Sequence, residues 1–219
     1  MLIAELNVFA VLGQLMYVAL ALTAIWGAFC VVMVWNRVRE KRFRNEDQQA
    51  EFLDALEEPV LRGDFDAAGE MLEMDKRAMS QLALLAIVNR DIGYEKVRQL
   101  IVDRFQRDVL ADLEHRLSWV NTVIKSAPMM GLLGTVMGMM GAFKTLASSE
   151  SVKPAQLAGD ISFALITTAC GLAIAIPLLL ATASINVRIR KMEDLVASGL
   201  SRFLESFRAG LAMDEPRLK

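Results

Sequence analysis

The chain has 219 residues, is 54% hydrophobic with a mean hydropathy of +0.37, and carries a formal net charge of −2. Acidic and basic residues are nearly balanced, which excludes a strongly basic surface for nucleic acid. The apolar residues gather into three uncharged blocks instead of the scattered periodic faces of a soluble domain, which excludes an ordinary soluble fold.

These blocks are residues 8–35, 126–143 and 161–187, and they contain 28, 18 and 27 residues without a charge. Roughly 20 apolar residues in a helix cross a hydrocarbon core, so each block is long enough. We predict an all-α membrane protein with three transmembrane helices. A secretory signal is the alternative for the first block. Glu5 precedes that block without any Lys or Arg, and the block is about twice as long as a signal core, so we expect an uncleaved anchor.

Basic residues predict the orientation of the spans, because Lys and Arg accumulate on the cytoplasmic side. They cluster directly after the first block (Arg37, Arg39, Lys41, Arg42, Arg44) and after the third (Arg188, Arg190, Lys191). The N-terminus is therefore expected outside and the C-terminus in the cytoplasm. The predicted segments are the N-terminus with the first span (1–36), a cytoplasmic helical segment (37–119), the second span (120–146), a short periplasmic hairpin (147–158), the third span (159–187) and a cytoplasmic C-terminal helix (188–219).

The cytoplasmic segment has a helical pattern and a mixed surface, with 14 basic and 18 acidic residues in 37–118. We predict helices at 49–58, ending at Pro59, and at 67–79, 79–89 and 94–119. Gly63 and Gly93 mark turns between them. The last of these helices is expected to continue into the second span without a loop, because no Gly or Pro occurs before Pro128. Packing within the bundle and against neighbouring copies is the favoured role of this segment, and a docking platform is the alternative.

The residue types that serve catalysis and metal binding are scarce. His115 is the only histidine, which excludes a multi-histidine metal site within one chain. We interpret it as a surface residue, with pH sensing as the alternative. Cys30 and Cys170 lie in apolar blocks, where they act as small fillers. The sequence has no nucleophile–base pair, phosphate-binding loop or metal-ligand cluster, so we expect no enzymatic activity, cofactor or metal.

The second and third blocks both carry a stripe of small residues. In the second block Gly131, Gly134, Gly138 and Gly141 fall within an arc of about 80° on one helix face. Such a face lets another helix approach closely in lipid. The stripe of the third block consists of Ala164, Thr168, Gly171 and Ala175, and Pro177 interrupts the helix in its inner half. We predict that both stripes pack helices around a pore.

Threonines accompany both stripes. Thr135 lies at the edge of the glycine face, and Thr167 lies beside Thr168. A threonine in a membrane helix either bonds to its own backbone or lines a polar path. Because two spans offer hydroxyls among small residues, we favour an ion pathway through these three threonines.

The middle of every span lacks ionisable side chains, and the nearest charges are Lys125, Lys144 and Asp160. A proton relay needs a titratable group near the bilayer centre. If the chain conducts protons, we therefore expect a partner to supply the carboxylate.

The two later blocks resemble a known family. The sequence APMMGLLGTVMGM at 127–139, followed by Ala142-Phe143, resembles the second span of the ExbB/TolQ/MotA proton-channel family, and ISFALITTACGLAIAIP at 161–177 resembles its third. The resemblance is strongest over residues 126–187. Three spans fit the ExbB/TolQ branch, since MotA-type stators have four.

The resemblance implies a subunit of an ion-driven motor in the bacterial inner membrane, which acts in biopolymer or protein transport. Such subunits form a pentamer whose lumen is lined by the second and third spans. The ring encloses the single transmembrane helices of two ExbD/TolR-like partners, and these partners bring the aspartate. Thr135 and Thr168 fall on the pore-lining threonine positions of the family.

One position departs from the family pattern. Many relatives have a glutamate in the third span where this chain has Phe163. Asp160, one turn outward, is a candidate to replace that charge and a candidate point at which ions enter. A non-conducting membrane scaffold and a stator-like subunit for motility are the alternative functions. The sequence leaves open whether the ion is H⁺ or Na⁺ and which process is driven.

Overall fold

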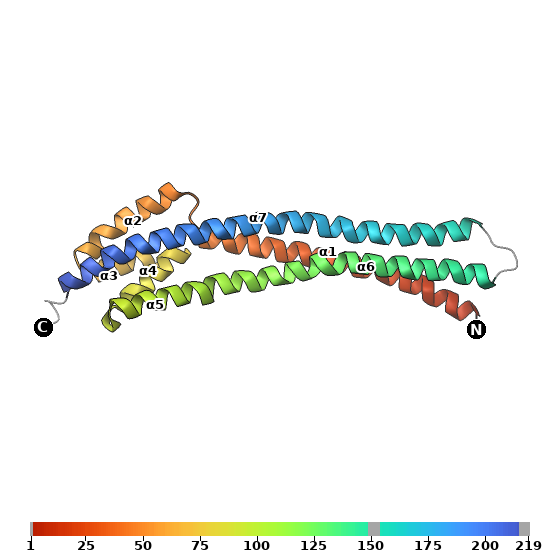
Figure 1. The fold of residues 1–219 in the computed structure, drawn as a ribbon, viewed down its shortest axis with the longest axis horizontal. Coiled ribbons are helices and arrows are strands. Elements are labelled where there is room, and N and C mark those ends of the chain that lie inside the picture. Colours follow the sequence, from red (N-terminus) through yellow and green to blue (C-terminus); the bar gives the residue numbers. More distant parts are fainter. Residues whose placement is uncertain (1, 149–153, 215–219) are drawn as a thin grey trace. The chain divides into compact units, whose positions relative to one another are not determined.

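The computed structural model describes residues 2–148 and 154–214, and every element within them is helical (Figure 1). This confirms the predicted all-α class. In chain order the elements are α1 (Leu2–Lys41), α2 (Glu46–Leu61), α3 (Phe65–Glu73), α4 (Ala78–Val88), the 3₁₀ turn η1 (Arg90–Ile92), α5 (Tyr94–Arg104), the π turn η2 (Phe105–Leu110), α6 (Ala111–Ser148) and α7 (Pro154–Asp214).

Three helices are long and apolar enough to cross a membrane, as predicted. The candidate spans lie within Gln14–Lys41, Tyr94–Ala147 and Leu157–Met213. The second of these runs without a loop from α5 through η2 into α6, which confirms the predicted continuity. The expected hairpin at 147–158 includes residues 149–153, which lie outside the described residues. The orientation of the termini stays a prediction.

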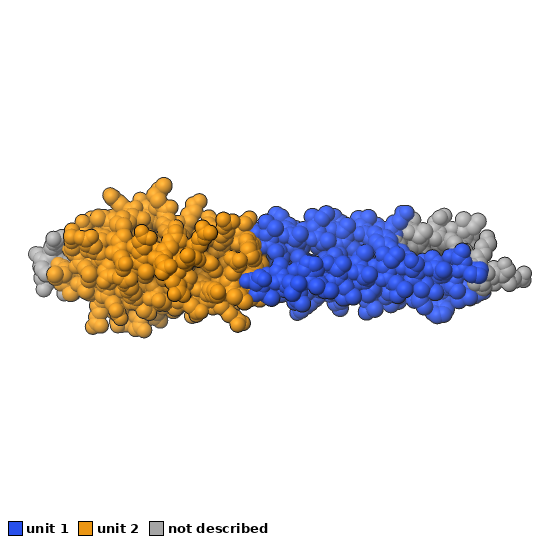
Figure 2. Space-filling model, turned by 90° about the horizontal axis from the view of Figure 1, so that it is seen from above, with its two compact units in different colours: residues 1–33, 116–184 blue, residues 34–115, 185–219 orange. Residues whose placement is uncertain are grey.

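The chain divides into two compact units, coloured separately in Figure 2. Unit 1 consists of residues 1–33 and 116–184, and unit 2 of residues 34–115 and 185–219. The helices α1, α6 and α7 each contribute residues to both units. Unit 1 holds most of the uncharged blocks, and unit 2 holds all the short helices.

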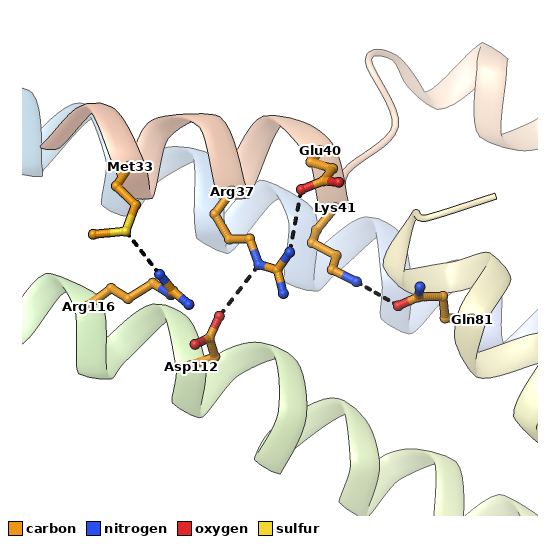
Figure 3. A network of polar contacts seen from close by, with 7 residues as sticks. All are labelled: Met33, Arg37, Glu40, Lys41, Gln81, Asp112 and Arg116. Atoms are coloured by element: carbon orange, nitrogen blue, oxygen red, sulfur yellow. Dashed lines mark hydrogen bonds and ion pairs between the residues drawn. The ribbon is translucent and has the colours of Figure 1, made fainter. Parts of the chain in front are cut away.

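Unit 1 is a three-helix unit in which α1 packs against both α6 and α7. A Cβ atom added at Gly27 would lie 2.7 Å from Leu178 Cδ1 and 2.8 Å from Val123 Cγ1. The guanidinium of Arg116 donates a hydrogen bond to Met33 Sδ at 3.2 Å (Figure 3). The contact at Gly27 shows that a side chain there would disturb the packing of both neighbouring helices.

The outer faces of unit 1 are strongly apolar. Large side chains that are at least half exposed include Leu22, Ile25, Trp26, Met129, Leu132, Leu133, Met140, Phe143, Leu165, Ile176, Leu179 and Leu180. A soluble monomer rarely exposes so many large apolar side chains. Lipid tails and other apolar helices are the surroundings that suit it.

Unit 2 packs its short helices against the C-terminal half of α7. Phe207 is fully buried, and its ring centroid lies 5.6 Å from that of Phe65. On the surface of the unit, Arg202 donates to the carboxylates of Asp54 and Glu57, at 2.5 Å each. Aromatic contacts and this charged clamp thus hold α2 and α3 on α7.

Polar contacts also join α1 to other elements of unit 2. Arg37 Nε lies 3.6 Å from a carboxylate oxygen of Asp112, and Lys41 Nζ donates to Gln81 Oε1 at 2.6 Å (Figure 3). These contacts connect the end of α1 to α6 and to α4. Surface pairs of this kind contribute modestly to stability, so they orient the elements more than they stabilise them.

The end of α2 differs from the sequence prediction. We predicted that the helix ends at Pro59, but Pro59 lies inside α2 and the helix continues to Leu61. Val60 is fully buried, so packing carries the helix past the proline. The turn that follows the helix contains Gly63, whose φ of 72° suits glycine because that residue has no Cβ.

The predicted helix at 67–79 is also interrupted, since α3 ends at Glu73 and α4 begins at Ala78. The carboxylate of Asp75 accepts hydrogen bonds from Arg77 N at 3.0 Å and from Ser80 Oγ at 2.7 Å. Arg77 lies directly before α4, so Asp75 contacts the start of that helix through one backbone N–H group and one side-chain hydroxyl. These bonds connect the break between α3 and α4 to the first turn of α4.

The π turn η2 has a cause in the apolar pattern. Ile101 and Leu113 are both buried, yet they are twelve residues apart and would point about 120° away from one another in an unbroken α-helix. A π turn closes i→i+5 bonds and so accommodates one residue more than an α turn. With that residue absorbed, the two side chains differ by only about 20° and lie on one face.

Deleting Gln106, an exposed residue of η2, tests this explanation. We expect the π turn to become regular α-helix while both apolar stretches keep their face, so the unfolding temperature in detergent falls by only a few degrees. Circular dichroism during heating gives the measurement.

Deleting Glu114 is the matched control, because it also removes one exposed residue. It must rotate either Leu113 or everything from Leu117 onward by about 100° away from its buried position. A loss of stability as large for Gln106 as for Glu114 would contradict the explanation.

Candidate functional site: the seam between α6 and α7

The predicted glycine face of α6 is in contact with α7 of the same chain. A Cβ atom added at Gly131 would lie 2.8 Å from Thr167 O and 3.0 Å from Thr168 Cα, and one added at Gly138 would lie 2.8 Å from Ala164 Cβ. Real Cβ atoms do not come this close to backbone atoms, so a larger residue would push the helices apart. The glycines therefore permit a close helix–helix contact.

The stripe on α7 matches this face from the other side. A Cβ atom added at Gly171 would lie 2.6 Å from Ala127 O and 3.2 Å from Pro128 Cα. We call this contact the α6–α7 seam, and its residues are Ala127, Gly131, Gly134, Gly138, Ala164, Thr167, Thr168 and Gly171. Figure 1 shows the two helices running side by side along it.

Two threonines of α7 bond across the seam. Thr167 Oγ1 lies 2.8 Å from Ala164 O in its own helix and 3.3 Å from Gly131 O, and Thr168 Oγ1 donates to Gly131 O at 3.1 Å. Thr167 is fully buried and Thr168 is half-buried. The carbonyl of Gly131 is thus the point where both hydroxyls meet α6.

Thr135 does not bond across the seam. Its hydroxyl donates to Leu132 O at 2.6 Å, in the same helix, and the side chain is half-buried. This is the self-bonded arrangement that we held as the alternative to a polar path. Although the hydroxyl donates its hydrogen bond to that carbonyl, its oxygen still has lone pairs that can accept a hydrogen bond or bind a cation.

The remaining predicted residues lie at or near the ends of the seam. Asp160 is half-buried, and its carboxylate lies 4.0 Å from where a Cβ atom at Gly141 would be. Ala175 is buried and Pro177 is exposed, within the continuous helix α7. Gly141 therefore makes a much looser contact than the other three glycines of its stripe.

The position of Phe163 faces α1. Its ring lies 5.3 Å from the ring of Tyr17, with the two planes at 86°. Edge-to-face aromatic pairs of this geometry are favourable. An aromatic contact between α1 and α7 thus occupies the position at which the resemblance implies a glutamate in many relatives.

One seam residue was missed from the sequence. Ala127 is fully buried against Gly171, and it precedes Gly131 by four residues, so it continues the small-residue stripe of α6. Extending that stripe by one turn would have found it.

The fold and the seam define a class, a multi-pass helical membrane protein whose second and third spans form a glycine-based hairpin with polar hydroxyls. The sequence profile of the MotA/TolQ/ExbB proton channel family matches residues 70–198, more than half of the chain. The chain belongs to this family.

Individual relatives agree with this assignment. The chain is 38% identical to the biopolymer transport protein ExbB of Helicobacter pylori over 116 residues, which cover 53% of this chain and 77% of that protein. It is 30% identical to ExbB of Aquifex aeolicus over 126 residues, 55% of this chain and 83% of that protein. It is 34% identical to the Tol-Pal system protein TolQ of Haemophilus influenzae over 94 residues, 43% of this chain but only 41% of that protein.

The seam predicts unequal tolerance to alanine among its glycines. We expect Gly171→Ala to destabilise the protein by about 1–3 kcal/mol, because the added methyl group would meet the backbone of α6, which cannot move aside. Gly141→Ala is the matched control, since its nearest neighbour lies 4.0 Å away. That variant should keep or slightly raise stability through the better helix propensity of alanine. Thermal unfolding in detergent compares the two, and equal losses would refute the close contact at Gly171.

Proposed function

We propose that this chain is the ring-forming subunit of an ion-driven motor in the bacterial inner membrane. In this proposal the ring is a pentamer, and a single-span ExbD/TolR-like protein supplies a transmembrane aspartate. Membership of the proton channel family supports the general role. Two of its relatives carry names from biopolymer transport and from the Tol-Pal system, which supports energy transduction as the process served.

The closed seam is the observation that carries the proposal of a ring. Cβ positions at Gly131, Gly138 and Gly171 lie within 3.0 Å of atoms of the opposite helix. No ion fits between helices in such contact, so a path cannot run through the seam of one chain. A path is then formed outside the seam, by faces that several copies bring together around a lumen.

Thr168 and Thr135 are the residues that we assign to this path. Thr168 lies half-buried at the edge of the seam, and its hydroxyl donates a hydrogen bond to Gly131 O. Both hydroxyl oxygens therefore present lone pairs, which suit a hydrated proton or Na⁺. Asp160 is the carboxylate nearest to the uncharged stretch of α7, and we assign it to the point where ions enter.

The strongest test replaces each path threonine. We expect Thr135→Ala and Thr168→Ala to lower ion flux at least tenfold, corresponding to about 1.4 kcal/mol in the barrier, because each removes an oxygen from an otherwise apolar wall. The chain is purified with its single-span partner and reconstituted in liposomes, and flux is measured under separate H⁺ and Na⁺ gradients. Native mass spectrometry reports whether the ring and its stoichiometry are retained.

Thr122→Ala is the matched control. Thr122 lies in the same helix and donates to its own backbone at Ser118 O, as Thr135 does to Leu132 O, but it lies outside the proposed path. Its replacement should leave flux unchanged. Wild-type complexes that assemble but pass neither ion would refute the motor and favour the non-conducting scaffold.

A further inference from the structure

Thr167 and Thr168 are adjacent in sequence, yet their surroundings differ. Thr167 is fully buried, and its hydroxyl lies within hydrogen-bond distance of two carbonyl oxygens, Ala164 O and Gly131 O. A hydroxyl has one proton to donate, and here both available acceptors belong to helix backbone. Thr167 therefore presents no polar surface outside the seam, whereas Thr168 is only half-buried.

The side chain of Thr167 fills a notch that Gly134 leaves on α6. The three atoms nearest to where a Cβ atom at Gly134 would lie all belong to Thr167: Oγ1, in direct overlap, then Cβ at 2.7 Å and Cγ2 at 3.0 Å. Any larger residue at position 134 would displace this side chain. Thr167 and Gly134 thus fit together as a protrusion and its socket.

This fit also determines the position of the neighbouring residue, Thr168. Movement of Thr167 along or around α6 would carry Thr168 with it and break the 3.1 Å bond between Thr168 Oγ1 and Gly131 O. A Cβ atom at Gly131 would lie only 3.0 Å from Thr168 Cα, so Thr168 has little room to adjust by itself. The contact between Thr167 and Gly134 therefore sets the register of the two helices at Thr168.

From this geometry we infer that Thr167 is a positioning residue, which locks α7 onto Gly134 of α6 and thereby places Thr168 at the edge of the seam. It takes no direct part in the ion path. The consequence for ion flux rests on the proposed function, whereas the lock itself does not.

The test adds a side chain at position 134 and removes the side chain at position 167. Gly134→Ala alone should lower ion flux about tenfold or more, because the added methyl group displaces Thr167. Thr167→Gly removes all three atoms that the methyl group would meet. The double variant Gly134→Ala/Thr167→Gly should therefore recover flux to within about fivefold of wild type, although position 167 no longer has a hydroxyl.

Gly138→Ala and Gly138→Ala/Thr167→Gly form the matched control pair. The neighbours of Gly138 are Ala164 Cβ at 2.8 Å and Asp160 O at 3.0 Å, not Thr167. Thr167→Gly should consequently give no recovery there. Rescue at Gly138 as large as that at Gly134 would overturn the lock as a specific pair.

Two measurements separate the lock from the motor. The unfolding temperature of each variant in detergent reports the lock without any ion transport, and flux in liposomes reports its consequence. Strong recovery of both in the double variant supports the inference. If the loss of unfolding temperature in the double variant equals the sum of the losses in the two single variants, the lock is overturned. If the double variant recovers stability but stays as inactive as Gly134→Ala, Thr167 is itself part of the ion path. Absence of flux in the wild-type complex would refute the proposed function while the unfolding temperatures still decide the lock.

Discussion

Close backbone contact between α6 and α7 is the constraint on which the rest of unit 1 depends. Lipid tails are as apolar as leucine, so burial of apolar surface gives membrane helices little reason to associate. Contact through Gly131, Gly134 and Gly171 replaces that driving force with packing, and it brings threonine hydroxyls within reach of a carbonyl on the other helix. The poor helix propensity of glycine is the cost of this arrangement.

Unit 2 uses the same device with a different side chain. Gln49 of α2 is almost fully buried, and its Nε2 donates to Leu195 O of α7 at 2.6 Å. A Cβ atom at Gly199 would overlap that nitrogen. In both units, a polar side chain occupies the space beside a glycine, and its polar atom lies within hydrogen-bond distance of a carbonyl about one turn before that glycine. A buried hydrogen bond of this kind fixes axial register, which apolar contacts alone leave open.

The sequence predicted the class of fold because charge-free blocks and glycine spacing are strong signals, but several details needed tertiary packing. Pro59 did not end the helix, which continues to Leu61, and the burial of Val60 favours this continuation. Before the second span, apolar residues recur every four positions from Val97 through Ile101 to Leu113. This spacing is longer than 3.6 residues and drifts around an α-helix, so the sequence already contained the reason for the π turn. The stripes predicted close packing at Gly131 and Gly171, but no pattern could show that the partner is the same chain. Nor could it distinguish the environments of Thr167 and Thr168.

The same packing bears on the position at which the resemblance implies a glutamate in many relatives. Phe163 meets the ring of Tyr17 on α1, so its position belongs to an aromatic contact between those helices. A carboxylate there would lose this contact and would lie against an aromatic ring, where burial of a charge is costly. Asp160 lies one turn away, and its backbone oxygen faces Gly138 at the seam. Within the proposed motor, the charge that accompanies the ion must then come from this outer end of α7 or from the partner helix, and the wall beside Thr168 stays neutral. In that proposed motor, a neutral wall lined by hydroxyl oxygens lets an ion pass without holding it, and the aspartate of the partner supplies the binding step.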